Sequence, residues 1–227
     1  MKEAHNQGQI KDFQDKVPVK LGPWTSHIYR TDPKNLVFLL ARYKFCSKLL
    51  TGKNHVLEIG CGDGFGIPVI LQSVKTVYGI DFEPQIIENM RNWLDSDLLS
   101  RCSFEVLDIT KEAPKTQFDA VYSLDVIEHI PKNTEKKFID NILKCLSPDG
   151  ICIIGTPNVN SQTYASEGSK IGHINLKSAE DLIELLLKGF KNIIIFSMND
   201  EVVHTDFYPM AHYLIAVCCG KKGVNNK

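Results

Sequence analysis

The sequence predicts a single α/β domain in which a mostly parallel sheet is covered by helices on both faces. Short apolar segments alternate with amphipathic ones along most of the 227 residues, as in consecutive βαβ units. One apolar segment, 56–59, runs directly into a cluster of four glycines. Because no linker-like stretch divides the chain, we expect one domain over residues 1–227.

The predicted strands are short apolar runs bounded by turn residues, the pattern of strands buried on both faces. They are 56–59, 76–80, 103–107, 118–124, 151–154, 192–196 and 212–218. Apolar residues at helical spacing predict helices over 36–50, 84–94, 135–146 and 178–187, with a weaker one around 10–13. We expect Asp32 and Pro33 to begin the helix of 36–50 as N-cap and first residue, and 147–150 to form a turn. Residues 158–172, rich in Asn, Ser and Gly, read as a mobile loop.

Composition and charge favour a small partner. The 26 Lys and Arg balance 27 Asp and Glu, whereas proteins that bind along a nucleic-acid backbone carry a basic excess. None of the seven cysteines forms a CxxC pair, which argues against a zinc knuckle and for reduced thiols. The polar start of the chain lacks the apolar core that a signal peptide has, and no apolar run reaches the roughly 20 residues of a membrane span. We expect a cytoplasmic protein with a small-molecule acceptor, no nucleic-acid partner and no membrane span.

The glycine cluster after the first strand predicts a ligand-binding loop. Its glycines stand at 60, 62, 64 and 66, and an acid, Glu58, precedes them. Glycines let a backbone turn sharply and approach a ligand closely at the carboxyl edge of a parallel sheet. The dinucleotide fingerprint GxGxxG would need glycine at position 65, where this chain has Phe65. The spacing therefore disfavours a nicotinamide or flavin site.

Residues 58–64 resemble motif I of class I S-adenosylmethionine-dependent methyltransferases, and the likeness extends from about residue 54 to residue 158. The resemblance implies that Gly60 and Gly62 pass under the methionine part of S-adenosylmethionine, and that Glu58 orients the loop and the amino group. It also implies a Rossmann-like sheet of seven strands, in the order 3-2-1-4-5-7-6, with the last strand antiparallel.

Acids after the second and third strands match the rest of this cofactor site. Asp81, 21 residues after Gly60, can accept hydrogen bonds from both ribose hydroxyls. By the resemblance, Phe82 lies against adenine, Asp108 accepts from the adenine amino group, and the Ile109 amide faces a ring nitrogen. Each acid alone could be a helix cap. Glu58, Asp81 and Asp108 at the ends of the first three strands, together with the glycines, predict an S-adenosylmethionine site.

Residues 118–130 resemble the "FDxV…xxEH" segment of the ubiquinone-biosynthesis-type branch of these enzymes. The resemblance implies that backbone groups near Leu124 hold the methionine end of the cofactor. The segment lacks the Asn/Asp-Pro-Pro-Tyr tetrapeptide that marks methylation of planar amines in the superfamily. Such amines are therefore disfavoured as acceptors.

Asp125, Glu128 and His129 would share one face of a helix, and two carboxylates with an imidazole can bind a divalent ion. In ubiquinone-type O-methyltransferases a similar Glu-x-x-Glu-His set is associated with magnesium. The alternative is that Glu128 and His129 fix the loop under the cofactor by hydrogen bonds. We favour this alternative and expect no metal.

His129 and His173 are the candidate general bases, because an imidazole can take a proton from a hydroxyl near neutral pH. We expect residues 1–35 to form a lid, 54–158 the cofactor-binding core, 158–175 a substrate loop and 221–227 a disordered tail. The weaker candidates for acceptor contacts are His27, Tyr29, Arg30 and Tyr164.

The predicted function is methyl transfer from S-adenosylmethionine to an oxygen or nitrogen of a small metabolite, such as a sugar, a nucleotide-linked sugar or a quinone precursor. Two alternatives come from other classes of protein. A nucleotide-cofactor oxidoreductase is disfavoured by Phe65, and a non-catalytic S-adenosylmethionine-binding subunit by the intact segment 125–129. A macromolecular methyltransferase is disfavoured by the charge balance, and the oligomeric state stays open.

Overall fold

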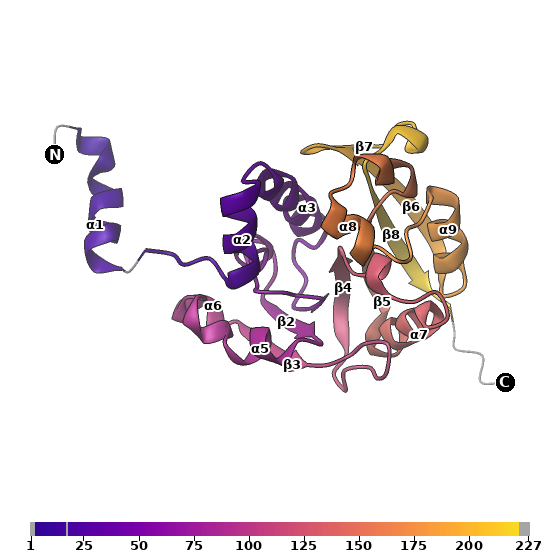
Figure 1. Ribbon diagram of the computed structural model, residues 1–227. Helices are drawn as coiled ribbons and strands as arrows, with labels where there is room; N and C mark the ends of the chain where they lie inside the picture. Colours follow the sequence, from indigo (N-terminus) through magenta and orange to yellow (C-terminus); the bar gives the residue numbers. More distant parts are fainter. Residues whose placement is uncertain (1–2, 17, 223–227) are drawn as a thin grey trace.

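A computed structural model describes residues 3–16 and 18–222 and places an eight-stranded sheet at the centre of this part of the chain (Figure 1). The sheet order is β3-β2-β1-β4-β5-β8-β6-β7. Five neighbouring strands are parallel: β1 (His55–Ile59), β2 (Thr76–Asp81), β3 (Cys102–Val106), β4 (Phe118–Leu124) and β5 (Leu146–Pro157). β8 (Tyr213–Lys221) lies antiparallel between β5 and β6 (Phe190–Asn199), and β7 (Val202–His204) is an edge strand.

The predicted order 3-2-1-4-5-7-6 and the antiparallel last strand are confirmed, but the sheet has eight strands where we expected seven. The additional strand is β7, which pairs with the end of β6 through a tight hairpin. Asp200 in this hairpin has a φ of 50°, in the left-handed region that tight turns require. β7 is only three residues long, too short for alternation to reveal it.

Helices cover both faces of the sheet, and each face has its own apolar core. On one face, α7 (Glu135–Cys145) and α9 (Ala179–Leu187) contribute Phe138, Ile142 and Leu182 to the first core. On the other face, α3 (Asn35–Leu49) and α4 (Ile67–Ile70) contribute Cys46 and Ile70 to the second core. Burial on both faces explains why the strands read as continuous apolar runs.

Several predicted helix boundaries are wrong. Asp32 ends α2 (Pro23–Thr31), a helix that we did not predict, and α3 begins only at Asn35. The predicted helix 84–94 divides into α5 (Pro84–Glu88) and a 3-10 turn, Met90–Asn92. By contrast, Ser178 opens α9 with a complete capping box, as the acids of its first turn suggested. Two further helices are α1 (Gln7–Asp15), which stands apart from the sheet in Figure 1, and α6 (Ser96–Leu99).

Three predicted loops or tails are more ordered than expected. Residues 158–172 form a 3-10 turn (Val159–Tyr164) and α8 (Glu167–Gly172). Residues 147–150 belong to β5, where the pairing shifts from Phe118–Leu146 to Ala120–Ile151 and the strand bulges. Lys221 ends β8, and residues 223–227 of the predicted tail lie outside the described residues. No helix among the described residues is long and apolar enough to cross a membrane.

Candidate cofactor and acceptor site

The glycine loop lies at the carboxyl end of β1, and its conformation requires glycine. Gly60, Gly62 and Gly64 have φ values of 73°, 53° and 76°, all in the left-handed region. A Cβ atom on Gly60 would lie 2.3 Å from the Val126 side chain, so a larger residue there would have to displace Val126. The resulting bare backbone is what a closely approaching ligand needs.

Asp81 joins this loop to the end of β2. Its carboxylate accepts hydrogen bonds from the amide of Gly62 (3.1 Å) and from the amide of Glu83 (3.0 Å). The residue is only 6% exposed, and burial raises the pKa of Asp81. The neighbouring Phe82 is 73% exposed, an unusual position for a large aromatic ring. An acceptor beside an uncovered aromatic face suits a ribose and its attached base.

Asp108 and Ile109 follow β3 at the same edge of the sheet. The Asp108 carboxylate accepts hydrogen bonds from the amide and hydroxyl of Thr110 (2.9 and 2.6 Å), and Lys111 lies 3.0 Å away. Partial burial alone would raise the pKa of Asp108, but these contacts lower it overall, so the group is an ionised acceptor. Among the described residues, the Ile109 amide donates no hydrogen bond. The Asp108 carboxylate can therefore accept a hydrogen bond from the edge of a nucleobase, and the Ile109 amide can donate one to it.

Glu58 is buried beneath the glycine loop, and its Oε2 atom has no hydrogen-bond partner among the described residues. Burial raises the pKa of Glu58 to about 8, and the nearby carboxyls of Asp81 and Asp63 add to this effect. A buried carboxyl oxygen without a partner is unfavourable unless a ligand supplies a donor. The ammonium group of S-adenosylmethionine is such a donor, so these residues fit the expected cofactor.

The end of β4 closes the other side of the loop. Ser123 pairs in register with Ile59 of β1, and its hydroxyl donates to the Ile59 carbonyl at 3.3 Å. Leu124 follows at the end of the strand, buried next to Gly155 of β5. The predicted cofactor contacts thus come together along the carboxyl ends of β1, β2, β3 and β4.

Helix α2 covers the glycine loop. The Asp63 carboxylate accepts from the amide and from the hydroxyl of Thr25, each at 2.8 Å. Because Thr25 lies in the first turn of α2, Asp63 acts as its N-terminal cap from a distant part of the chain. The Trp24 ring lies against Gly62, 3.1 Å from where a Cβ atom would stand. His27, Tyr29 and Arg30 of this helix are exposed.

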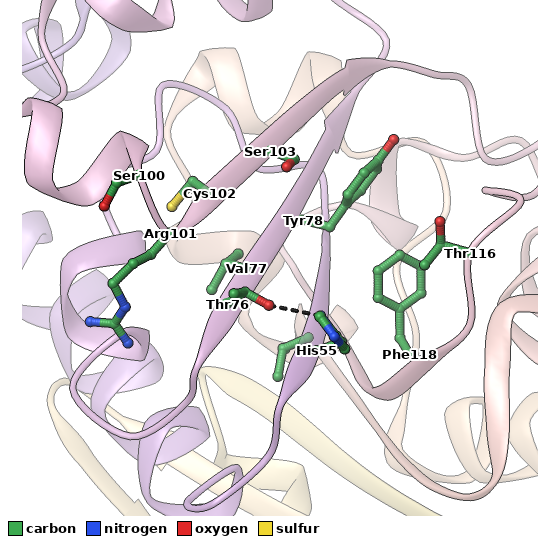
Figure 2. A pocket seen from close by; sticks show the side chains of 11 residues that line it. His55, Thr76, Val77, Tyr78, Ser100, Arg101, Cys102, Ser103, Thr116 and Phe118 are labelled. Carbon is green, nitrogen blue, oxygen red and sulfur yellow. Dashed lines mark hydrogen bonds between the residues drawn. The ribbon is translucent and has the colours of Figure 1, made fainter.

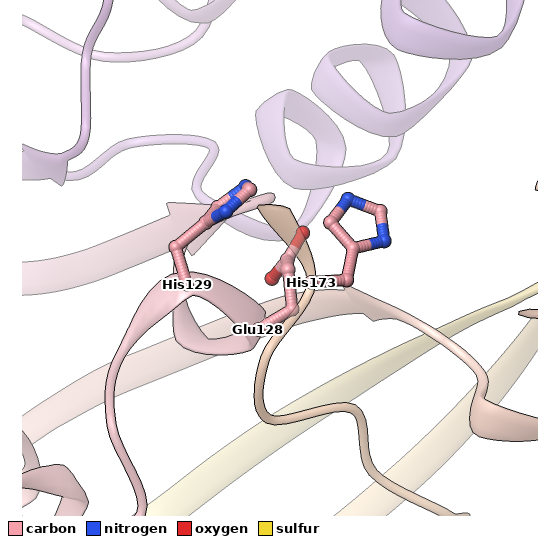
Figure 3. Close-up of side chains that lie close together, drawn as sticks. All are labelled: Glu128, His129 and His173. Atoms are coloured by element: carbon pink, nitrogen blue, oxygen red, sulfur yellow. The ribbon is translucent and has the colours of Figure 1, made fainter. Parts of the chain in front are cut away.

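Glu128, His129 and His173 lie together beyond the end of β4, as Figure 3 shows. One potential ligand atom from each lies within 4.8 Å of the others. The two imidazoles meet edge to face with centroids 5.1 Å apart, and His129 Nδ1 is 2.9 Å from the carbonyl oxygen of Gly172. Burial, and then the neighbouring His129, lower the pKa of His173. The two predicted bases, 44 positions apart in the sequence, therefore form one cluster.

Asp125 does not join this cluster, so the set Asp125, Glu128 and His129 does not form. Asp125 has a φ of 57°, and only the next residues make a short 3-10 turn, Ile127–His129. A continuous helix would have aligned all three side chains. Instead, the Asp125 carboxylate accepts two hydrogen bonds from Arg42 Nη1, at 2.8 and 2.9 Å.

Arg42 and Tyr213 are site residues that the sequence did not indicate. The Arg42 guanidinium lies 3.8 Å from the centre of the Tyr213 ring, a cation–π contact. Arg42 stands in the stretch 36–50 together with Lys44 and Lys48, so its charge did not distinguish it in the sequence. Its guanidinium compensates the charge of the half-buried Asp125 carboxylate.

Glu128 is fully buried, and Thr156 donates a hydrogen bond to its Oε2 atom at 3.0 Å. Burial, and then the charge of Asp125, raise the pKa of Glu128 to about 8. Oε1 has no hydrogen-bond partner among the described residues. This raised pKa favours the protonated, neutral carboxyl in the folded protein near pH 7.

This shift predicts a pH-dependent stability. A carboxyl whose pKa rises on folding contributes stability below its unfolded pKa near 4.5, and loses it as the pH rises toward 8. In the wild-type protein the free energy of unfolding should therefore fall between pH 5 and pH 8. We expect this fall to be smaller in Glu128→Gln by roughly 2–4 kcal/mol, measured by urea titration at each pH. Glu180→Gln, an exposed acid on α9, is the control and should change nothing. Equal pH dependence in all three proteins would contradict the assignment.

A separate cavity of about 270 Å³ lies at the amino ends of β1 to β4 (Figure 2). Its lining includes the first residue of each of these four strands, which are His55, Thr76, Cys102 and Phe118. The glycine loop follows the opposite ends of the same strands. This cavity is therefore not part of the candidate site.

Comparison with known proteins identifies the family. The methyltransferase domain family matches residues 50–204 of the chain. The ubiquinone biosynthesis O-methyltransferase of Coxiella burnetii is 27% identical over 165 residues, which cover 71% of this chain and 65% of that protein. The phosphoethanolamine N-methyltransferase of Plasmodium falciparum is 31% identical over 158 residues, covering 66% and 59%. The chain thus spans about 60–65% of the length of these relatives.

Solved structures show the same fold. The N-methyltransferase NodS of Bradyrhizobium japonicum, in complex with S-adenosylhomocysteine, superposes with a TM-score of 0.57 at 20% identity, covering 85% of this chain and 90% of NodS. A TehB-like methyltransferase of Corynebacterium glutamicum gives 0.59 at 21% identity, covering 88% and 100%. Since the family match extends over more than half of the chain, the protein belongs to the methyltransferase domain family, in its class I S-adenosylmethionine-dependent branch.

Proposed function

We propose that this protein transfers the methyl group of S-adenosylmethionine to an oxygen or nitrogen of a small metabolite, such as a sugar, a nucleotide-linked sugar or a quinone precursor. The observation that carries the proposal is the cluster of Glu128, His129 and His173 beside the glycine loop. Val126, which contacts Gly60, is only three residues from His129. A proton-accepting group thus stands next to the expected cofactor site.

In this proposal each cofactor contact has a separate task. Gly60 and Gly62 admit the methionine part, Glu58 and the backbone at Leu124 hold its polar end, and Asp81 binds the ribose. The adenine lies on Phe82, with its edge at Asp108 and the Ile109 amide. Within the predicted lid, α2 covers the site, which its contacts with the glycine loop support.

The protein's contribution to the reaction is alignment and proton removal. When bound, S-adenosylmethionine supplies a methyl carbon made electrophilic by the sulfonium charge, and the carbon–sulfur electron pair stays with sulfur. The core 54–158 and the loop 158–175 hold the acceptor in line with that carbon and exclude water. For a hydroxyl acceptor, His129 or His173 takes the proton as the new bond forms.

The relatives include one protein named for oxygen methylation and one named for nitrogen methylation, so they do not choose between the two. The histidine pair favours oxygen, because a neutral hydroxyl is a weak nucleophile unless a base takes its proton, whereas a neutral amine can attack without losing a proton first. Tyr164, 85% exposed in the loop 158–175, is available for acceptor contacts.

Transfer of labelled methyl groups tests the proposal. The protein is incubated with methyl-labelled S-adenosylmethionine and either the small-molecule fraction or the macromolecular fraction of a cell extract. We expect label in the small-molecule fraction and equimolar S-adenosylhomocysteine. Label found only in macromolecules would contradict the acceptor class. Binding of S-adenosylhomocysteine without any transfer would instead favour the non-catalytic subunit.

Chelation should leave the reaction intact. Magnesium prefers several ionised oxygen ligands, but Asp125 is neutralised by Arg42, and burial keeps Glu128 protonated at pH 7. We therefore expect turnover in excess EDTA within about twofold of the untreated rate. Loss of turnover with EDTA and recovery with magnesium would show that Glu128 and its neighbours hold a metal.

A further inference from the structure

A buried polar network joins the segment 172–177 to the segment 128–135, and none of the proposed cofactor or base contacts uses it. Asn175 and Lys177 are only 7% and 4% exposed. The Lys177 ammonium donates to the Glu135 carboxylate at 2.8 Å and to the Asn175 side-chain oxygen at 2.5 Å. The Asn175 side-chain nitrogen donates to Glu135 at 3.1 Å. The three side chains thus form a closed triangle.

The network holds the backbone on both sides of His129. The Asn175 amide donates to the carbonyl of Glu128, and the Asn175 side chain donates to the carbonyl of Ile130, each at 2.9 Å. Its other end is anchored at the base of the loop, where the Lys177 carbonyl accepts from the Val159 amide at 3.0 Å. Asn175 therefore sets the distance between the loop and the turn that carries His129.

Burying a lysine and an asparagine is unfavourable unless their polar atoms are satisfied, and apolar side chains could join the same segments without that cost. The Lys177 charge is compensated by the Glu135 carboxylate. Burial alone would raise the pKa of Glu135, but Lys177 and Asn175 lower it overall. Such a network constrains position more strongly than apolar packing does, because each contact has a direction.

The position that matters is that of the Gly172 carbonyl against the His129 ring. A carbonyl oxygen can only accept, so at 2.9 Å the neutral ring must carry its proton on Nδ1. Nε2 then has a free lone pair, as a general base requires. In water the neutral histidine ring favours the opposite tautomer, with the proton on Nε2. The contact with Gly172 therefore selects the form of His129 that can accept a proton at Nε2.

We propose that Asn175, together with Lys177 and Glu135, is a positioning residue that holds the Gly172 carbonyl against His129 and thereby fixes the Nδ1–H tautomer. The assignment rests on the proposed function only in giving His129 the role of base. Asn175 acts through the backbone of Glu128 and Ile130, and it does not contact the expected cofactor or the reacting atoms. His173, which meets the same ring edge to face, limits its rotation from the other side.

Nitrogen-15 NMR of the full chain tests the proposal without cofactor or acceptor. Long-range ¹H–¹⁵N correlation spectra show which nitrogen of each neutral imidazole carries the proton, at a pH about two units above the ordinary pKa near 6.5. The spectrum of His129→Gln assigns the His129 signals among the seven histidines. We expect a protonated Nδ1 and an unprotonated Nε2 in the wild-type protein.

In Asn175→Ala we expect the His129 Nε2 signal to move toward the protonated position, and Lys177→Met should move it in the same direction. Lys177→Arg keeps a cation opposite Glu135 and should restore the wild-type spectrum. Asn160→Ala is the matched control, because Asn160 lies in the same loop but its side chain donates to Pro209 instead. Should Asn175→Ala fail to fold, Glu135→Gln, which keeps the side-chain shape, replaces it with the same expectation.

An Nε2–H tautomer in the wild-type protein, or an unchanged tautomer in the folded network variants, would overturn the proposal. Either result leaves methyl transfer itself untouched. Conversely, a protein with the expected tautomer but no transfer to any small molecule would contradict the proposed function alone.

Discussion

Asp81→Ala is expected to weaken the binding of S-adenosylhomocysteine by about two to four orders of magnitude. In the proposed complex two ribose hydroxyls donate to this carboxylate, and each hydrogen bond to a charged acceptor contributes roughly 1.5–3 kcal/mol. At about 1.4 kcal/mol per tenfold change, the sum spans that range. Isothermal titration calorimetry of the folded variant measures the effect directly.

Asp81 also ties the glycine loop to β2, so the alanine variant alone would mix lost ribose contacts with a loosened loop. Asp81→Asn separates the two effects, because its amide oxygen can keep the hydrogen bond from Gly62. We expect Asn at this position to bind the cofactor better than Ala but less well than Asp. Asp97→Ala, an exposed acid on α6, serves as the control. Unchanged affinity in Asp81→Ala would contradict the ribose assignment.

The parallel core of the fold could be predicted because local sequence carries its signal. Strands buried on both faces appear as apolar runs, and β1 ends where the glycines begin. The acids Asp81 and Asp108 could be placed because parallel strands end at a common edge, so sequence position alone brings them together. The resemblance to class I methyltransferases supplied the strand order, which periodicity does not contain.

What the sequence could not show depends on contacts between distant segments. Arg42 meets Asp125 across 83 positions, and Lys177 meets Glu135 across 42. Helix α2, which begins at Pro23, was not predicted, because Asp63 supplies its cap from the glycine loop, far along the chain. His173, and not Asp125, lies with Glu128 and His129. This depends on the positive φ of Asp125, which interrupts the expected helix and which no local sequence pattern indicates.

For a hydroxyl acceptor, His129→Ala is expected to lower kcat by about 10²–10⁴-fold, the usual contribution of a positioned general base. Cofactor affinity should stay near the wild-type value, because none of the proposed cofactor contacts involves this ring. His173→Ala should lower kcat by at least about tenfold, since it removes the partner of the His129 ring and a second potential base. Steady-state kinetics with the acceptor found in the transfer assay measure both effects.

Two further readouts distinguish a lost base from a damaged site. The fall of the rate at low pH reports protonation of the base, so this acid limb should disappear in the variant that removes it. Added imidazole should partly restore the activity of His129→Ala, because a free base can enter the space that the side chain leaves. His55→Ala is the control, since His55 bonds to Thr76 at the opposite edge of the sheet.

If both variants keep nearly normal kcat and an unchanged acid limb, the histidine-base mechanism is wrong. The acceptor is then an amine or an oxygen that is already ionised, and the protein accelerates the transfer chiefly by alignment. The position of His129 argues for the base. His129 lies in the turn after β4, and its contact with the Gly172 carbonyl leaves Nε2 free to accept the proton.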